Sequence, residues 1–155
     1  MIKMGKTIAR NRKAFHNYDF EEFYEAGLAL VGTEVKALRE GRAHLKDSYA
    51  VVADGGLELL GAYIGPYGNA PVNQQHDTER TRKLLLKKRE IKELIGKLSR
   101  EGYSLIPVQI YFNNRGWAKV QLGLGKGLKK HDKRRKIKER DEKRRLRQQY
   151  NARVR

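Results

Sequence analysis

Few residues of this chain are of the types that carry out catalysis. The histidines form no metal-binding H-x-x-x-H pair, because they are scattered at His16, His44, His76 and His131. His76 is followed by Asp77, and we interpret this pair as solvated loop residues rather than a catalytic dyad. Cysteine is absent, which excludes disulfides, thiolate metal sites and cysteine nucleophiles. The sequence therefore predicts a protein that is not an enzyme and that uses no metal and no cofactor.

Two further patterns are too weak to indicate a reaction. Glu21 and Glu22 are adjacent carboxylates, but nothing else in the sequence points to a glycosidase site. The run Gly123-x-Gly125-x-Gly127 follows a predicted strand, as a phosphate-binding loop does, yet it lacks the P-loop spacing. A block of charged residues follows it instead of a packed helix. We interpret this run as a flexible hinge.

The charge of the chain is the stronger signal. Its 155 residues include 35 Lys and Arg against 18 Asp and Glu, a net charge of +17. Bases cluster at residues 10–13 and 80–89 and above all at 126–155, where 15 bases face four acids. Such an excess indicates a polyanionic partner, most often a nucleic acid. No run approaches the roughly 20 apolar residues of a membrane-spanning helix, and the first residues lack the apolar core of a signal peptide. We expect a cytoplasmic protein with no membrane partner.

Residues 126–155 are predicted to be a basic tail that follows a globular body at residues 1–125. Acids precede bases by four residues at Asp132, Glu139 and Asp141, an order that stabilises a helix by about 0.2–0.5 kcal/mol per pair. The few apolar residues of the tail form no continuous stripe that would dock on the body. We predict a tail that is disordered when free and helical once phosphates neutralise its charge.

The first part of the body is predicted to contain a long strand and a short helix. Residues 18–31 fit a strand face and a helical stripe almost equally well, and Gly27 together with the aromatic residues favours the strand. Thr33 is predicted to cap a helix at residues 34–39, which Gly41 ends.

A hairpin and a loop are predicted next. Residues 48–53 and 57–64 have the composition of strands, and Asp54-Gly55-Gly56 between them is a hairpin signal. Residues 65–78 are rich in turn formers and predict a loop.

A long helix is predicted at residues 78–100. Leu84 and Leu94 then lie on the core face, together with Ile91, Ile95 and Leu98, whereas Leu85 and Leu86 lie off it. Two strands follow, at 103–112 and 117–124. In the second of them Lys119 and Gln121 face away from the core, and Pro107 in the first indicates an edge or a bulge.

These elements predict a mainly β protein. We expect a small antiparallel β-barrel of the oligonucleotide-binding (OB) type, with a short and a long helix and the basic tail. A ferredoxin-like split β-α-β fold is the alternative, but the helix count and strand order suit it less well.

Several blocks of residues between positions 8 and 142 resemble one family, small protein B, the SsrA-binding proteins that partner transfer-messenger RNA (tmRNA) in bacteria. The resemblance rests on Asn11-Arg12-Lys13-Ala14, Tyr24-Glu25-Ala26-Gly27, Gly32-Thr33-Glu34-Val35-Lys36, Arg80-Thr81-Arg82-Lys83-Leu84-Leu85-Leu86 and His131-Asp132-Lys133-Arg134. Thr78, Lys87 and Leu128 depart from the residues usual in the family.

The resemblance implies an OB-type barrel that binds the tRNA-like domain of tmRNA and delivers it to the A site of stalled ribosomes. It implies that the tail occupies the decoding centre and the empty mRNA channel of the small ribosomal subunit, against ribosomal RNA. Asn11, Glu25 and Leu85 match family residues that matter for RNA binding. The position of Leu85 off the predicted core face independently supports its assignment; the alternative is that Leu85 packs under the 65–78 loop.

The predicted site residues follow from the basic clusters and the resemblance. We expect tmRNA to be bound by Asn11, Arg12, Lys13, Glu25, Lys36, Arg39, His76, Arg80, Arg82, Lys83 and Leu85. We expect the ribosome to be bound by Lys126, Gly127, Lys129, Lys130, His131, Asp132, Lys133, Arg134, Arg135 and Lys138. The protein is expected to be a monomer when free. The alternatives are a general ribosomal-RNA-binding protein and an RNA-processing enzyme with a basic targeting tail.

Overall fold

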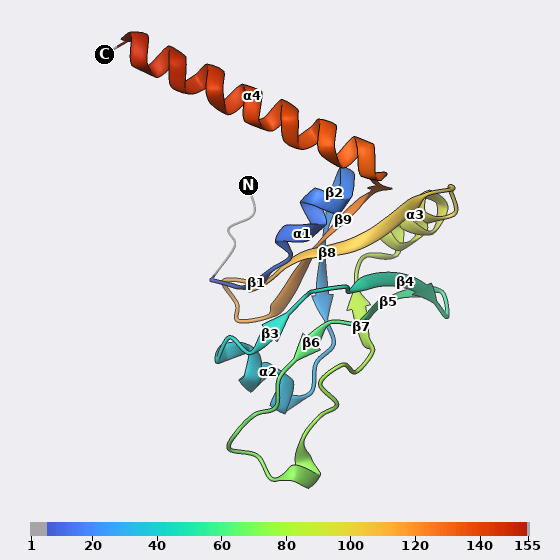
Figure 1. Cartoon of the computed structure of the whole chain (residues 1–155). Coiled ribbons are helices and arrows are strands. Elements are labelled where there is room, and N and C mark those ends of the chain that lie inside the picture. The colour runs from blue at the N-terminus through green and yellow to red at the C-terminus, as the bar shows by residue number, and fades with distance from the viewer. Residues whose placement is uncertain (1–5, 155) are drawn as a thin grey trace.

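The computed structural model describes residues 6–154 as a curved β structure from which one long helix projects (Figure 1). The strands are β1 (Thr7–Arg10), β2 (Tyr18–Leu28), β3 (Ala43–His44), β4 (Tyr49–Ala53), β5 (Gly56–Leu60), β6 (Tyr63–Ile64), β7 (Arg82–Leu85), β8 (Tyr103–Phe112) and β9 (Ala118–Gly127). The helices are α1 (Arg12–Asn17), α2 (Gly32–Arg39), the 3-10 turn η1 (Val72–Gln74), α3 (Lys88–Leu98) and α4 (Lys130–Val154). The prediction of a mainly β protein with several helices is confirmed.

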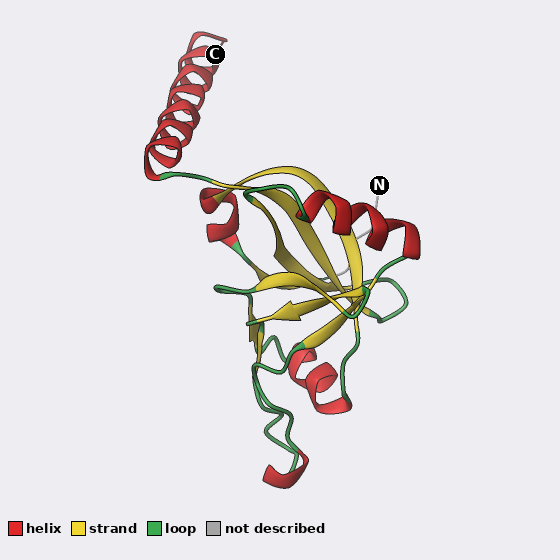
Figure 2. Ribbon diagram, turned by 90° about the vertical axis from the view of Figure 1, so that its right-hand side faces the viewer, coloured by secondary structure: helices red, strands yellow, loops and turns green. Residues whose placement is uncertain are grey.

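The main sheet is antiparallel and closes on itself. Its strand order is β1-β8-β4-β5-β7-β2-β9, and β9 also pairs with β8. The pairings therefore form a ring of six strands, from β8 through β4, β5, β7, β2 and β9 back to β8, while β1 adds to β8. Figure 2 shows the strands curving around a common centre. The apolar residues that point into this ring form the core, among them Leu57, Leu59, Leu84, Leu105, Val120 and Leu122.

Strand β2 confirms the strand interpretation of residues 18–31, although it ends at Leu28. Tyr24, Ala26 and Leu28 pack on the core, so Phe23 and Glu25, which alternate with them, face outward. The register with β9 shifts between Phe20 and Glu22, which marks a bulge.

The predicted hairpin is confirmed. Asp54 and Gly55 have φ angles of +48° and +73°, which a two-residue turn between twisted strands requires. The second predicted strand is wrong in its length, because β5 ends at Leu60 and the chain turns at Gly61, whose φ is +76°. Residues 63–64 then form β6, which pairs with β3 instead.

The predicted helix at 78–100 is wrong in its first half. Arg82 and Leu84 are buried while Lys83 and Leu85 are exposed, and this alternation belongs to strand β7 between β5 and β2. Leu, Lys and Arg are good helix formers, so the composition of this segment predicted a helix. The alternation of buried and exposed residues extends over only four residues and was too short to indicate a strand. The helix that does form, α3, begins only at Lys88.

Helix α2 forms as predicted, but its N-terminus is satisfied differently. The Glu34 carboxylate accepts a hydrogen bond from the Val31 amide (2.9 Å), whereas the Thr33 hydroxyl is hydrogen-bonded to His76 Nδ1 (2.8 Å). The Thr33 cap is therefore wrong. The stop at Gly41 is confirmed by its φ of +76°.

The glycine run at 123–127 is not a hinge, because it lies within strand β9. A Cβ at Gly125 would lie 2.1 Å from the Asp19 backbone oxygen, and one at Gly123 would lie 2.6 Å from the Phe20 ring. These glycines are needed for close approach of β2 and β9. The bulge predicted at Pro107 is present, between Pro107 and Gln109 of β8.

Helix α4 projects away from the sheet, and its side chains between 137 and 152 are exposed (Figures 1 and 2). At its base the Leu128 amide donates to the Asn17 carbonyl (2.8 Å), and Lys136 Nζ donates to the carbonyls of Phe15 (3.1 Å) and Tyr18 (3.4 Å). The helix agrees with the acid-before-base pattern of the tail. Its disorder in the free protein stays a prediction.

Candidate nucleic-acid interface

The outer face of strands β7, β2 and β9 brings together residues that are far apart in the chain. Gly27 of β2 lies opposite Leu85 of β7 on one side and Lys119 of β9 on the other. Two residues earlier on β2, Glu25 lies opposite Gln121 of β9. We call Glu25, Gly27, Leu85, Lys119 and Gln121 the sheet face.

Leu85 is an exposed apolar side chain at the centre of this face. Its side chain is 51% exposed, although its neighbour Leu84 is buried in the core. A Cβ at Gly27 would lie 3.3 Å from Leu85 Cβ and 3.7 Å from Lys119 Nζ. The glycine therefore lets an apolar surface and an ammonium group approach each other, a pairing that suits the flat face and the phosphate of a nucleotide.

The carboxylate of Glu25 is held in place by a hydrogen bond from a buried tyrosine. The hydroxyl of the buried Tyr111 donates a hydrogen bond to Glu25 Oε2. Burial, and then this hydrogen bond to a carboxylate, raise the pKa of Tyr111 well above its usual value, so the phenol remains a donor. Within the part of the chain that the structure describes, Glu25 Oε1 has no hydrogen-bond donor. It can accept from an amino or imino group of a base.

A buried ion-pair cluster supports the edge of β7. Glu34 Oε2 accepts from Arg82 Nε (2.5 Å), and Glu34 Oε1 accepts from Arg80 Nη2 (2.6 Å). Burial raises the pKa of Glu34, but the hydrogen bonds from Arg80, from a backbone amide and from Arg82 outweigh it, so the net pKa is lowered. Burial lowers the pKa of Arg82, and the hydrogen bond with Glu34 opposes this.

This cluster corrects the expectation for Arg82. Its side chain is completely buried, and it also donates to the carbonyls of Ala62 (2.6 Å) and Thr78 (3.2 Å). A guanidinium enclosed in this way cannot reach RNA, so Arg82 fastens the loop before β7 instead. Arg80 is 36% exposed, but its inner side is used by Glu34 and by the Ala29 carbonyl (3.1 Å).

His76 also has a structural part. Its Nδ1 is paired with the Thr33 hydroxyl, and its Nε2 lies 2.9 Å from the Ile64 carbonyl. Both ring nitrogens are therefore engaged within the protein, and His76 fastens the 65–78 loop to α2. Lys36 and Arg39 of α2 are exposed, and Lys36 Nζ lies 5.3 Å from the centre of the Tyr67 ring. Lys83 is exposed on β7 opposite Glu58.

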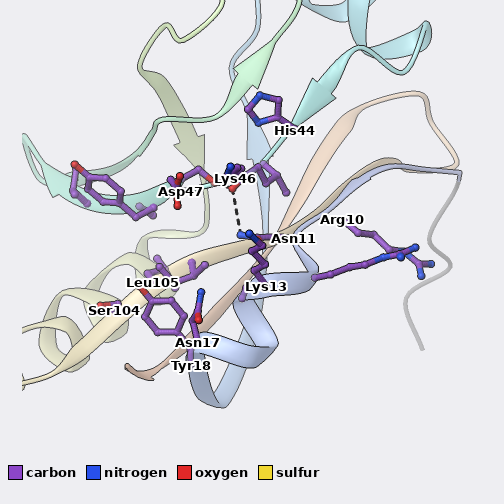
Figure 3. Close-up of a pocket in the computed structure, with 18 of the residues that line it drawn as sticks. Arg10, Asn11, Lys13, Asn17, Tyr18, His44, Lys46, Asp47, Ser104 and Leu105 are labelled. Atoms are coloured by element: carbon purple, nitrogen blue, oxygen red, sulfur yellow. Dashed lines mark hydrogen bonds between the residues drawn. The ribbon is translucent and has the colours of Figure 1, made fainter. Parts of the chain in front are cut away.

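Asn11, Arg12 and Lys13 lie at the start of α1, outside the three strands of the sheet face. They line a cleft of about 810 Å³, bordered by α1 and β8 on one side and by the β3–β4 segment on the other (Figure 3). Asn11 Nδ2 donates across this cleft to the Leu45 carbonyl (3.3 Å) and, on its own side, to the Pro107 carbonyl of β8 (3.1 Å). Arg12 and Lys13 are exposed, and His44 and Lys46 line the same cleft from the β3–β4 segment.

The predicted ribosome-binding residues continue from β9 into α4. Lys126 and Gly127 end β9, while Lys129 and the residues from Lys130 onward follow as exposed or half-exposed side chains. His131 Nε2 lies 2.9 Å from Asp132 Oδ1. In the described part of this segment, the contacts with the body are confined to its first two turns.

The sequence-based site missed Lys119 and Gln121. Their signal was present, since the alternation of β9 placed both away from the core, but only the register with β2 shows that Glu25 and Leu85 lie beside them. It also missed Glu34, whose partners are 46 and 48 residues away.

A basic protein with a curved β-sheet, exposed aromatic rings and a charged helix has the features of an RNA-binding protein. In the described residues no group of His, Asp and Glu is arranged to hold a metal ion, and no helix is long and apolar enough to cross a membrane.

Comparison with known proteins gives the family. The model of the family described as SmpB protein matches residues 8–152. The SsrA-binding protein of Sinorhizobium fredii (strain NBRC 101917 / NGR234) is 54% identical over 136 residues, which is 88% of this chain and 85% of that protein. The SsrA-binding protein of Geobacillus kaustophilus (strain HTA426) is 50% identical over 151 residues, which is 96% of this chain and 95% of that protein. This chain belongs to the SmpB family.

A solved structure agrees with this assignment. The chain superimposes with a TM-score of 0.67 and 45% identity on a chain of the structure described as "tmRNA-SmpB: a journey to the center of the bacterial ribosome". The match covers 83% of this chain and 92% of that one.

Proposed function

We propose that this protein is an RNA-binding adaptor of trans-translation, which binds the tRNA-like domain of tmRNA (SsrA RNA) and delivers it to the A site of stalled ribosomes. Delivery rescues the ribosome and lets the incomplete protein be tagged. Membership of the SmpB family, relatives that are SsrA-binding proteins and the similarity to SmpB in a tmRNA–ribosome structure support this function.

The observation that carries the proposal is the sheet face. Leu85, Glu25 and Lys119 offer an apolar surface, a hydrogen-bond acceptor and a positive charge on three paired strands. Such a combination reads the shape and base edges of a folded RNA as well as its charge. The closed ring of strands supports an OB-type barrel, which is a common frame for RNA binding. The adaptor acts by binding and performs no catalysis.

The tail has a separate task in this proposal. Residues 126–155 occupy the decoding centre and the empty mRNA channel, where their bases contact phosphates of ribosomal RNA. Helix α4, at 25 residues and 1.5 Å per residue, spans roughly 37 Å. The free protein is a cytoplasmic monomer in which the tail is disordered, and the helix forms on the ribosome. The body supplies tmRNA binding, and the tail supplies ribosome binding.

Replacement of Leu85 tests the function at its centre. Leu85→Ala should weaken binding to tmRNA at least fivefold in a gel shift, since an apolar group buried against the RNA contributes about 0.8 kcal/mol per CH2 and the substitution removes more than one such group. Val72→Ala is the matched control, because Val72 is a 92% exposed apolar residue of η1 outside the sheet face. Equal binding by both variants would contradict the assignment of the sheet face.

A further inference from the structure

An aromatic cluster on the surface is not part of the sheet face defined above. Phe15 of α1 and Phe23 of β2 are 44% and 47% exposed, and their ring centres lie 6.2 Å apart. Phe20 lies between them, 5.4 Å from Phe15 and 5.7 Å from Phe23. Tyr18 stacks on Phe20 at 5.9 Å and 17°. Two half-exposed phenylalanines are thus supported by two more buried rings.

A bulge in β2 and a glycine in β9 bring these rings together on one face of β2. The bulge between Phe20 and Glu22 puts Phe20 and Phe23 on the same side of β2, although they are three residues apart. Gly123 of β9 leaves the space that the Phe20 ring occupies. Phe20 in turn packs on a small core of Ala14, Ile106 and Val108. The exposed rings therefore sit on a rigid base.

A hollow with both apolar and amide side chains opens beside Phe15. It has a volume of about 440 Å³, and it is lined by Phe15 and Val108, by the amides of Gln109 and Gln121, and by residues 10–12. Gln109 Nε2 donates to Gln121 Oε1 (2.7 Å), which fixes the Gln121 amide with its nitrogen as a donor. Within the described residues no acceptor is bound to that nitrogen.

We infer that Phe15 and Phe23 form a stacking platform for an unpaired nucleobase of the RNA, whose edge is read in the hollow by Gln121. Exposed rings accept the flat face of any base, and a fixed amide donor supplies an acceptor-specific contact at its edge. This inference rests on the proposed function, because the RNA that offers the base is the one bound by the sheet face.

Charge and continuity favour RNA as the ligand. Arg10 and Arg12 lie at the hollow, where they can contact the phosphates that flank a base. Gln121 lies opposite Glu25, and Phe23 lies two residues before Glu25 on the same side of β2. The platform therefore extends the sheet face toward α1 without a break, and one RNA can cover both.

The test compares two double variants of the full-length chain. Phe15→Leu with Phe23→Leu keeps apolar contacts with Phe20 but removes the flat rings, whereas Phe15→Tyr with Phe23→Tyr keeps them. Affinity for tmRNA and for bulk tRNA is measured by gel shift, and thermal unfolding checks that each variant is folded. Tyr150→Leu is the matched control, since Tyr150 is an exposed aromatic residue (68%) far along α4.

The inference predicts that the leucine variant loses roughly fivefold or more in affinity for tmRNA, the loss of one stacked base, while the tyrosine and Tyr150 variants stay within about twofold. Irradiation at 254 nm should also join Phe15 or Phe23 to a nucleotide, which mass spectrometry identifies. A folded leucine variant that binds tmRNA as tightly as the unaltered protein would overturn the platform. In that case the proposed function still stands, provided that the unaltered protein binds tmRNA more tightly than bulk tRNA. Equal affinity of the unaltered protein for tmRNA and for bulk tRNA would overturn the proposed function. If the leucine variant then lost affinity equally for both RNAs, the result would still support stacking on Phe15 and Phe23.

Discussion

Glu25 and Lys119 lie on the same face, but in the proposed function they act on RNA through different forces. Lys119 offers a charge that displaces a counterion from phosphate, so its contribution weakens with salt. Glu25 offers a hydrogen-bond acceptor held by Tyr111, and no phosphate is attracted to it. Salt dependence therefore separates the two roles.

Lys119→Ala should weaken tmRNA binding and reduce the slope of log K against log salt by about one. Glu25→Ala should weaken binding while the slope stays the same, because no phosphate contact is lost. Gel shifts between 50 and 300 mM salt, about the range in which such slopes are measured, give both quantities. Identical slopes for the two variants would contradict the division.

Glu34 is a second residue whose environment makes a definite prediction. Its removal leaves Arg82 as a buried charge without its partner, which typically costs about 3–5 kcal/mol. Glu34→Gln should therefore lower the urea midpoint strongly. Glu40→Gln is the control, because the Glu40–Arg42 pair is 39% and 50% exposed and such pairs contribute about 0–1 kcal/mol.

The same carboxylate sets a pH dependence. The pKa of Glu34 is lower in the folded protein than in the unfolded chain, so the ionised form favours folding. Its stabilisation is complete above the unfolded pKa, near 4.3, and is lost as the pH falls through the lowered pKa. Urea unfolding from pH 6 down to about pH 3 should show the unaltered protein losing more stability than Glu34→Gln. Parallel curves would contradict this assignment.

At the scale of elements, β7 explains why Leu85 was placed correctly for a wrong reason. A helical wheel put Leu85 off the core face, and a strand does the same because its neighbours alternate. Leu84→Ala should destabilise the protein by about 2–5 kcal/mol, whereas Leu85→Ala should change stability little. Urea denaturation of the two variants checks this, and similar losses for both would contradict strand β7.

Strand β9 contains glycines whose role, the close approach of β2 and β9, is known only from the structure. Gly125→Ala should force β2 and β9 apart and destabilise the protein, since the new Cβ would meet backbone at 2.1 Å. Gly96→Ala in α3 meets nothing within 4 Å and should stabilise by up to about 1 kcal/mol. Thermal unfolding compares them. A Gly125→Ala protein as stable as the original would restore the hinge interpretation.

These elements show which parts of the fold and of the candidate site could be predicted from the sequence. Period-2 alternation of Ala118, Val120, Leu122 and Leu124 identified β9, and Asp54-Gly55 fixed a hairpin, because both signals are local. Four residues of β7 were too few to outweigh helix-forming composition. The Glu34–Arg82 pair and the contact of Gly27 with Leu85 join distant parts of the chain, and no local pattern encodes them. Leu85 and Glu25 entered the site through the family resemblance, whereas Lys119 entered through the strand register.

At the scale of the whole molecule, the body and α4 present different surfaces. The body contains the core and the sheet face, while α4 is almost entirely exposed and contacts the body only near its base. Deletion of residues 128–155 should leave binding of isolated tmRNA largely intact and abolish tagging on stalled ribosomes in a translation assay. Loss of both activities together would contradict the separation of tasks.

The central claim is that the body recognises a particular RNA by shape and that charge alone does not explain binding. The most direct measurement is a salt-series gel shift of the full-length protein with tmRNA, bulk tRNA and a ribosomal RNA fragment of similar size. We predict a preference for tmRNA that persists at moderate salt while binding to the other two RNAs fades. Equal binding to all three RNAs, lost together as the salt concentration rises, would contradict the claim and indicate a general ribosomal-RNA-binding protein.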